Sequence, residues 1–185
     1  MMKYVNAEVV FQEVPNEITL AINISGCPVR CPDCHSKYLW EDIGIELNEE
    51  SLGNLIVLNY GITCVAFMGG DADPSYIGYM ARFIRIKFPK LKIAWYSGKS
   101  SIPSCIILNL QNFDYIKLGP YIKEYGPLNS KTTNQLFFKV QEYRLINITN
   151  YFLKEDDKDI SKWDLKSVKF SDDNNTSKYD VSPAS

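Results

Sequence analysis

The sequence predicts an α/β fold with a mostly parallel sheet and helices packed outside it. Short apolar runs typical of strands alternate with runs of helical spacing over residues 18–118, and this alternation is the pattern of βαβ units. The chain has 185 residues, of which 45% are hydrophobic and 23% charged. This length and composition are sufficient for one globular domain with a sizeable core.

Four strands are expected, and each of them ends in a loop that contains glycine. In the first, residues 18–24, apolar and polar residues alternate as in a strand with one buried face. The others are residues 62–68, 92–96 and 115–118. The loops after the four strands contain Gly26, Gly69-Gly70-Asp71, Ser97-Gly98 and Gly119-Pro120. Because parallel strands end at the same edge of a sheet, these loops are expected to share one rim.

Three helices are expected between the strands. Asn48 is a candidate N-cap for the first helix, which has glutamates in its first turn and ends before Gly61. The second helix begins at Asp73 and Pro74, a pair that suits a helix start, and it ends at Pro89. A weaker third helix occupies residues 104–112.

The folded domain is expected to span residues 1–152. Beyond it the composition becomes charged and polar, so residues 153–185 are expected to form a loosely attached, solvated tail. The net charge of −2 gives no basic excess that would indicate a nucleic-acid partner. No signal peptide and no apolar run of bilayer length is visible, so we expect a cytoplasmic protein without a membrane partner.

A cluster of soft ligands begins where the first expected strand ends. It consists of Cys27, Cys31, Cys34 and the only histidine of the chain, His35. Clustered thiols in a reducing compartment are more typical of metal sites than of disulfides. A zinc site would need ligands from the adjacent positions 34 and 35. A c-type haem could attach to the motif C-x-x-C-H at residues 31–35, but haem attachment belongs with export. Structural buried thiols are a third alternative, although three of them rarely gather beside two prolines.

An iron–sulfur cluster fits the spacing best. A [4Fe–4S] cluster normally takes four thiolates, and the C-x3-C-x2-C loop supplies three, with no fourth cysteine nearby. The remaining iron could bind a small molecule through an amine and a carboxylate and pass an electron into it. Cys64 and Cys105 lie apart in apolar surroundings and are expected to be small buried residues.

The cysteine loop resembles that of the radical S-adenosylmethionine superfamily. The segments GCPVRCPDCHSKYLW, FMGGDADP, WYSG, FDYIKLGPYI and TTNQLFF are similar, in this order, to segments of the activating proteins of anaerobic (class III) ribonucleoside-triphosphate reductases. The resemblance covers about residues 4–138. It implies a partial (βα) barrel with fewer βα units than a full barrel, and a cluster loop after the first strand.

By this resemblance Cys27, Cys31 and Cys34 ligate three irons of a [4Fe–4S] cluster, and S-adenosylmethionine binds the fourth iron. Reductive cleavage would yield methionine and a 5′-deoxyadenosyl radical, which takes a hydrogen atom from a glycine of the large reductase subunit. The implied partners are that subunit and a reduced flavodoxin- or ferredoxin-like electron donor. No catalytic side chain is expected beyond the cluster ligands.

The resemblance also assigns residues to the binding of S-adenosylmethionine. They are Asp33, Cys34, His35, Gly69, Gly70, Asp71 and Ser97. The glycine-rich strand end would contact the amine, and backbone groups of residues 33–35 would contact the nucleoside. Many members of the superfamily have an aromatic residue in place of Asp33, and Ser97 replaces a threonine while keeping the hydroxyl. Asn134-Gln135 resembles an Asn-Gln pair in the closing segment of the family.

Other functions are compatible with the same residues. Another glycyl-radical activase, or a radical enzyme like the one that makes 7-carboxy-7-deazaguanine, would also carry such a cysteine loop. From a different class, an iron–sulfur electron carrier would hold a cluster without cleaving S-adenosylmethionine. It would not need the loop Gly69-Gly70-Asp71 beside its cluster.

Overall fold

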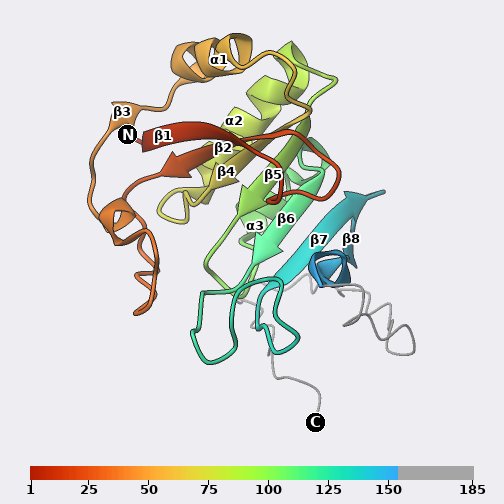
Figure 1. The fold of residues 1–185 in the computed structure, drawn as a ribbon. Helices are drawn as coiled ribbons and strands as arrows, with labels where there is room; N and C mark the ends of the chain where they lie inside the picture. Colours follow the sequence, from red (N-terminus) through yellow and green to blue (C-terminus); the bar gives the residue numbers. More distant parts are fainter. Residues whose placement is uncertain (154–185) are drawn as a thin grey trace.

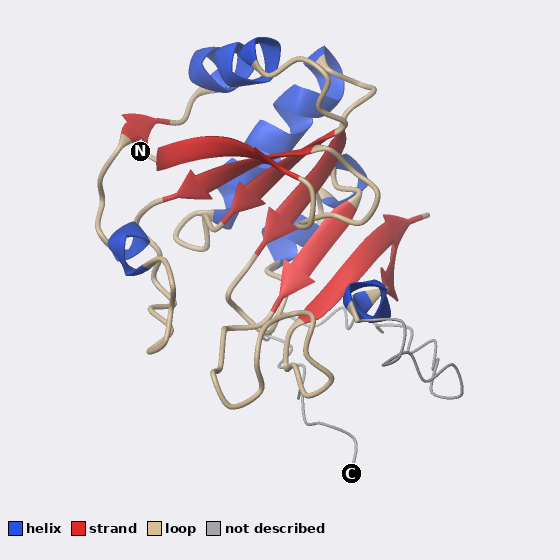
Figure 2. Ribbon diagram, viewed as in Figure 1, coloured by secondary structure: helices blue, strands red, loops and turns tan. Residues whose placement is uncertain are grey.

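Eight strands form one open, mixed sheet in the computed structural model, which describes residues 1–153. Their order across the sheet is β3-β1-β2-β4-β5-β6-β7-β8 (Figures 1 and 2). The strands are β1 (Lys3–Val10), β2 (Thr19–Ile24), β3 (Ile45–Glu46), β4 (Cys64–Met68), β5 (Lys92–Tyr96), β6 (Tyr115–Leu118), β7 (Leu136–Gln141) and β8 (Arg144–Asn147). The tail predicted at residues 153–185 lies outside the described residues, apart from Leu153.

The helices lie between strands along the chain, except for the last one, which follows β8. They are η1 (Lys37–Trp40), α1 (Glu49–Leu58), α2 (Pro74–Lys87), α3 (Ser104–Ile107), η2 (Leu110–Asn112) and η3 (Thr149–Phe152), where η denotes a 3₁₀-helix. α2 and α3 lie on one face of the sheet, behind it in the view of Figure 2. The predicted α/β class is therefore confirmed.

The centre of the sheet is parallel and its flanks are antiparallel. β2, β4, β5 and β6 run parallel to one another. β1 pairs antiparallel with β2 and β3, and β7 pairs antiparallel with β6 and β8. The prediction of a mostly parallel sheet is wrong, because only three of the seven neighbouring pairs are parallel. The cysteine loop also follows the second strand of the chain, β2, because the hairpin partner β1 precedes it.

The first two helices start as their sequences predict. Asn48 Oδ1 accepts a hydrogen bond from Ser51 N at 2.9 Å, and Ser51 Oγ accepts one from Asn48 N at 2.9 Å. α1 therefore begins with a reciprocal capping box. At the start of α2, Asp73 Oδ1 accepts from Tyr76 N at 3.0 Å, and Pro74 occupies the first turn.

The helix predicted over residues 104–112 is interrupted. α3 ends at Ile107, and η2 begins only at Leu110. Between them Asn109 has φ of −112°, and its side-chain amide donates to Cys105 O at 2.8 Å. An asparagine amide that bonds to a nearby carbonyl offers the backbone an alternative to the helix, which explains the break.

Both faces of the central strands are buried. In β4, Val65 and Phe67 belong to the large core cluster that includes α2, whereas Cys64 and Ala66 belong to a smaller cluster on the other face. The smaller cluster also contains Val14, a fully buried residue of the connection between β1 and β2. This connection therefore covers the face of the sheet that the α-helices leave open.

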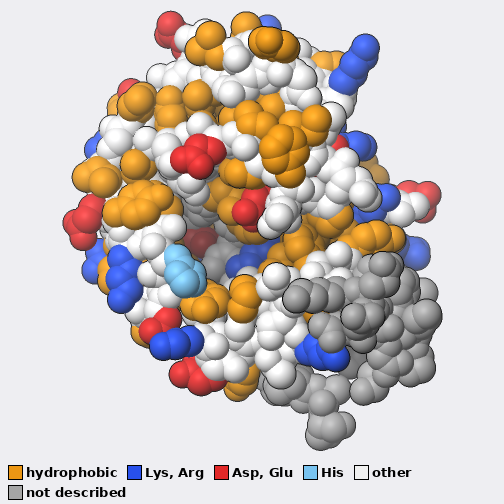
Figure 3. Space-filling model, viewed as in Figure 1, with side chains coloured by type: hydrophobic (Ala, Val, Ile, Leu, Met, Phe, Trp, Pro, Cys, Tyr) orange, Lys and Arg blue, Asp and Glu red, His pale blue; other side chains and the backbone are white. Residues whose placement is uncertain are grey.

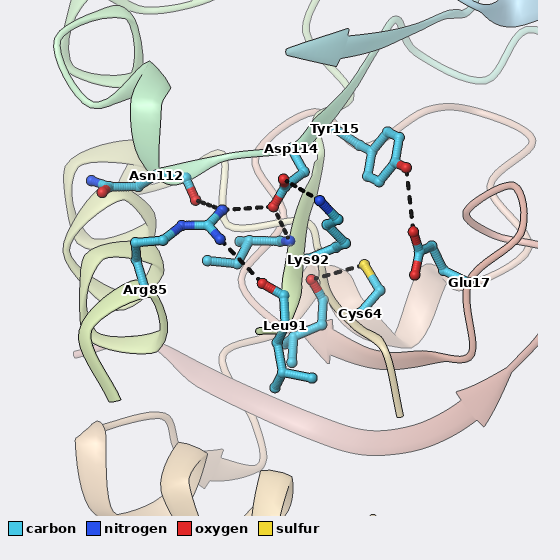
Figure 4. Close-up of polar contacts among 10 residues, drawn as sticks. Glu17, Cys64, Arg85, Leu91, Lys92, Asn112, Asp114 and Tyr115 are labelled. Atoms are coloured by element: carbon cyan, nitrogen blue, oxygen red, sulfur yellow. Dashed lines mark hydrogen bonds and ion pairs between the residues drawn. The ribbon is translucent and has the colours of Figure 1, made fainter. Parts of the chain in front are cut away.

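A charged network ties α2 to the starts of β5 and β6 (Figure 4). The Arg85 guanidinium donates to Asp114 Oδ2 at 2.6 Å and to the carbonyl oxygens of Leu91 at 3.2 Å and Asn112 at 3.0 Å. Asp114 also accepts from Ile93 N at 2.9 Å. Arg85 thus donates hydrogen bonds to two separate connections, the one before β5 and the one before β6.

Replacing Arg85 by methionine is expected to lower the free energy of unfolding by about 1 to 3 kcal/mol, because half-buried acceptors lose a charged donor. Arg82→Met on the same helix is a matched control, since Arg82 is exposed and has no hydrogen bond or ion pair with the rest of the described chain. Its effect should stay within about 0.5 kcal/mol. Equal losses in urea unfolding of the two variants would contradict a role for the network.

Candidate functional site

The cysteine loop leaves the sheet at the end of β2 and returns to it through η1. Backbone hydrogen bonds close its neck: Gly26 N donates to Glu41 O at 3.0 Å, and Cys27 N donates to Leu39 O at 2.9 Å. Within the loop, Cys34 N donates to Cys31 O at 3.0 Å. The three cysteines therefore lie on one closed excursion from the sheet edge.

All three thiols of this loop are free and partly exposed. Cys34 Sγ accepts a hydrogen bond from Ser36 N at 3.3 Å. Among residues 1–153, no three His, Cys, Asp or Glu side chains are arranged so that they could hold a metal ion together. The chemistry of the donor set nevertheless fits a [4Fe–4S] cluster, because one loop offers three unpaired thiols, one of which has a backbone N–H directed at its sulfur.

The glycine loop follows β4 on the neighbouring strand. Gly69 and Gly70 have φ of 112° and 89°, which is the left-handed region that favours glycine. Gly69 N donates to Tyr96 O at 3.0 Å, and Trp95 Nε1 donates to Gly69 O at 2.8 Å. A Cβ on Gly70 would lie 2.5 Å from Ile77 Cδ1. Ile77, a buried residue of α2, thus fills the space beside this glycine.

Asp71 links the ends of β4 and β5. It is 3% exposed, and both of its carboxylate oxygens are used within the protein. Ser97 Oγ donates to Asp71 Oδ1 at 2.5 Å, and Gly98 N donates to Asp71 Oδ2 at 2.8 Å. Ser97 Oγ in turn accepts from Lys99 N at 3.0 Å. Asp71 and Ser97 therefore fix the two loops to one another.

The Ser97–Gly98 turn also contacts the cysteine loop. A Cβ on Gly98 would lie 3.0 Å from Cγ2 of Val29, which stands between the first two cysteines. Pro28 and Val29 line a small cleft together with Gly98 and Lys99. The rim expected from the sequence thus brings together the cysteine loop, the glycine loop and the Ser97–Gly98 turn.

A larger cleft of about 640 Å³ opens beside this rim. Its lining includes Cys34, His35, Tyr96, Lys117 and Gln135. Figure 3 shows a hollow on this face of the molecule, with the histidine at its edge and charged side chains in its depth. Such a volume suits a small molecule.

The predicted nucleoside contacts differ in their relation to this cleft. Cys34 and His35 line it, and the His35 ring lies 5.2 Å from the ring of Tyr121. Asp33 is exposed and is not among the residues that line the cleft. Of the pair Asn134-Gln135, Gln135 lines the cleft, whereas the Asn134 amide donates to Pro120 O at 2.9 Å.

Sequence reasoning missed Lys117, a lysine of β6 that is only 9% exposed and lines the cleft. Its ammonium donates to Gly119 O at 2.6 Å. Burial lowers the pKa of Lys117 to about 8, although Cys31 and Asp71 act in the opposite direction. The signal was a charged residue inside the otherwise apolar strand YIKL, which is unusual for a central strand.

Because burial lowers the pKa of Lys117, the free energy of unfolding depends on pH. Between pH 8 and pH 10.5 the unfolded chain holds a proton on Lys117 that the folded chain has released, so folding becomes more favourable as the pH rises through this window. Below pH 8, burial of the charged Lys117 ammonium lowers the free energy of unfolding by its full amount, and Lys117→Met removes this loss. The unfolding free energy of the variant relative to the wild type should therefore fall by about 3 kcal/mol from below pH 8 to above pH 10.5. Urea unfolding across the window measures this, and a difference that does not change with pH would contradict it.

No family model, no curated protein and no solved structure matches this chain. Within the described part, no helix is both long and apolar enough to span a membrane.

Proposed function

We propose that this chain is an iron–sulfur activase of the radical S-adenosylmethionine type, which generates a glycyl radical on an anaerobic ribonucleoside-triphosphate reductase. The observation that carries the proposal is the meeting of three loops at the carboxyl edge of parallel strands. They are the C-x3-C-x2-C loop after β2, the glycine loop after β4 and the Ser97–Gly98 turn after β5. The partial (βα) barrel belongs to the same proposal and is compatible with an open sheet that has four parallel central strands.

In this proposal Cys27, Cys31 and Cys34 would hold three irons of a [4Fe–4S] cluster. When bound, the reduced cluster supplies the electron that splits S-adenosylmethionine into methionine and a 5′-deoxyadenosyl radical. Exposure of the thiols at the loop surface leaves them accessible to incoming iron and sulfide.

In this proposal the remaining residues of the site hold the loops and the ligand in position. Asp71 accepts from Ser97 Oγ and Gly98 N, so it holds the rim in place before a ligand binds. By the resemblance, backbone groups at Gly69 and Gly70 and at Cys34 and His35 would contact S-adenosylmethionine. Such fixed backbone groups reduce the entropy lost when the ligand binds.

The open side of the cleft is an argument for a protein substrate. Four parallel strands do not enclose a radical site, and a reactive radical must be kept from water. We therefore infer that a glycine segment of the large reductase subunit closes the cleft. A flavodoxin- or ferredoxin-like protein would supply the electron in the cytoplasm, with no nucleic acid or membrane involved.

The test is anaerobic reconstitution of the full chain with iron and sulfide, followed by reduction and addition of S-adenosylmethionine. Formation of 5′-deoxyadenosine, together with a glycyl radical signal on a candidate reductase by paramagnetic resonance, is the expected result. A cluster-loaded protein that forms no 5′-deoxyadenosine would instead favour an electron carrier. Formation of 5′-deoxyadenosine without a radical on the reductase would favour another activase or a 7-carboxy-7-deazaguanine synthase-like enzyme.

A further inference from the structure

Lys117 is a buried cation without a counter-ion. The three ion pairs of the described chain involve Lys3, Arg85 and Lys92, and none of them involves Lys117. Its only hydrogen bond in the same part of the chain is the one to Gly119 O. An ammonium group has three N–H donors, so two of them lack a protein acceptor.

Two groups favour the charged form of Lys117, first Cys31 and then Asp71, but neither is bonded to its ammonium. The Asp71 carboxylate accepts from Ser97 Oγ and Gly98 N and lies beyond ion-pair distance of the ammonium. A buried charge is costly unless it is paired and hydrogen-bonded. The fold therefore carries an electrostatic cost at Lys117 that an anion from outside could offset.

The cleft gives such an anion access to Lys117. Among the described residues that line it, Lys117 is the only lysine or arginine, and the amide of Gln135, which is 6% exposed, adds a hydrogen-bond donor. Glu13 is the only acidic residue of this lining. Burial disfavours the charged form of its carboxyl group and so raises its pKa.

We propose that this cleft binds the oxyanion of a small-molecule ligand, a carboxylate or a phosphate group, on the ammonium group of Lys117. The proposal rests on the cleft and its unpaired lysine and not on the iron–sulfur function, so the two can fail separately. In the proposed activase this oxyanion would belong to a second ligand, since the resemblance assigns the carboxylate of S-adenosylmethionine to the open iron.

The test titrates the cluster-free full chain with inorganic phosphate and with acetate, at an ionic strength kept constant with chloride, by calorimetry. Binding by the wild type should weaken by about tenfold or more in Lys117→Gln, because a charged donor to the anion is lost. Lys99→Gln, at the neighbouring rim, is the matched control and should bind like the wild type. Phosphate binding alone identifies a phosphate ligand, and acetate binding alone identifies a carboxylate.

A second measurement needs no variant. An amine-reactive ester labels lysines of the wild-type protein, and mass spectrometry reads the label at each position. The bound anion should protect Lys117 and leave Lys99 unchanged. Absence of binding by both anions, equal binding in Lys117→Gln, or equal protection of both lysines would overturn the proposal. Loss of anion binding once a cluster is reconstituted would also overturn it, because the cluster would then be the counter-ion.

Discussion

Single replacement of Cys27, Cys31 or Cys34 by alanine is expected to abolish both cluster uptake and 5′-deoxyadenosine formation. Loss of a group that only orients a metal ligand costs about 10- to 100-fold, so loss of a ligand should cost at least about 100-fold. All three cysteines lie on one loop closed at its neck by Gly26 and Cys27, and each is a free thiol. Iron and sulfide content, visible absorption and 5′-deoxyadenosine yield measure the effect.

The two remaining cysteines provide the control. Cys64 is fully buried in β4, and burial raises its pKa, which disfavours the thiolate that a metal needs. Cys105 lies in α3 and packs against the large core cluster. Cys64→Ala and Cys105→Ala should keep the cluster and the activity.

Stability separates ligand loss from misfolding. Because the loop thiols are partly exposed, their alanine variants should unfold within about 0.5 kcal/mol of the cluster-free wild type. Cluster uptake by a loop variant at the wild-type level, or its loss in Cys64→Ala or Cys105→Ala, would exclude the proposed ligand set.

The central part of the fold could be predicted because its signals are local. The starts of α1 and α2 depend on Asn48 and Asp73, whose side chains bond to backbone groups three residues ahead. The apolar runs of β4, β5 and β6 are buried in a parallel core, where continuous hydrophobic runs are typical. Strand ends and helix starts therefore follow from nearby residues alone.

The flanking strands could not be predicted from such signals. β7 and β8 are joined through Glu142 and Tyr143, which have φ of 50° and 61°. A tight hairpin turn with two positive φ values is usually marked by Asn-Gly, and neither residue here is of that type. The hairpin of β7 and β8 thus lacks a recognisable turn sequence.

The site was predicted as a set of loops but not as a set of contacts. That loops after parallel strands share an edge follows from topology, and Val29 does lie against Gly98. The bond from Ser97 to Asp71 joins residues 26 positions apart, and it depends on β4 and β5 being neighbours. Lys117 lies beside the same edge because β6 pairs with β5, and its only signal in the sequence is a charge inside an apolar strand.

Gly70→Ala is the structural change with the largest expected effect, a loss of about 2 to 5 kcal/mol in the free energy of unfolding. Gly70 has φ of 89°, and a Cβ there would lie 2.5 Å from Cδ1 and 2.6 Å from Cγ1 of Ile77. Ile77 is fully buried in α2, so it cannot move aside without disturbing the core. Chemical unfolding of the cluster-free protein measures the loss.

Gly61→Ala separates the two causes of this loss. Gly61 has φ of 91°, almost the same as Gly70, but a Cβ on it would meet no atom within 4 Å. This control should cost only the about 1 to 2 kcal/mol of a left-handed backbone with a side chain. Any further loss in Gly70→Ala then measures the contact with Ile77.

A double-mutant cycle completes the argument. Ile77→Ala removes both atoms with which the new Cβ would clash. The double variant Gly70→Ala/Ile77→Ala should therefore be more stable than the sum of the two single losses predicts, by about 1 to 3 kcal/mol. If the losses simply add, or if Gly70→Ala costs no more than Gly61→Ala, close packing on Ile77 does not explain the glycine. A positive coupling would mean that position 70 requires glycine for the packing of α2 on the sheet, before any ligand reaches the rim.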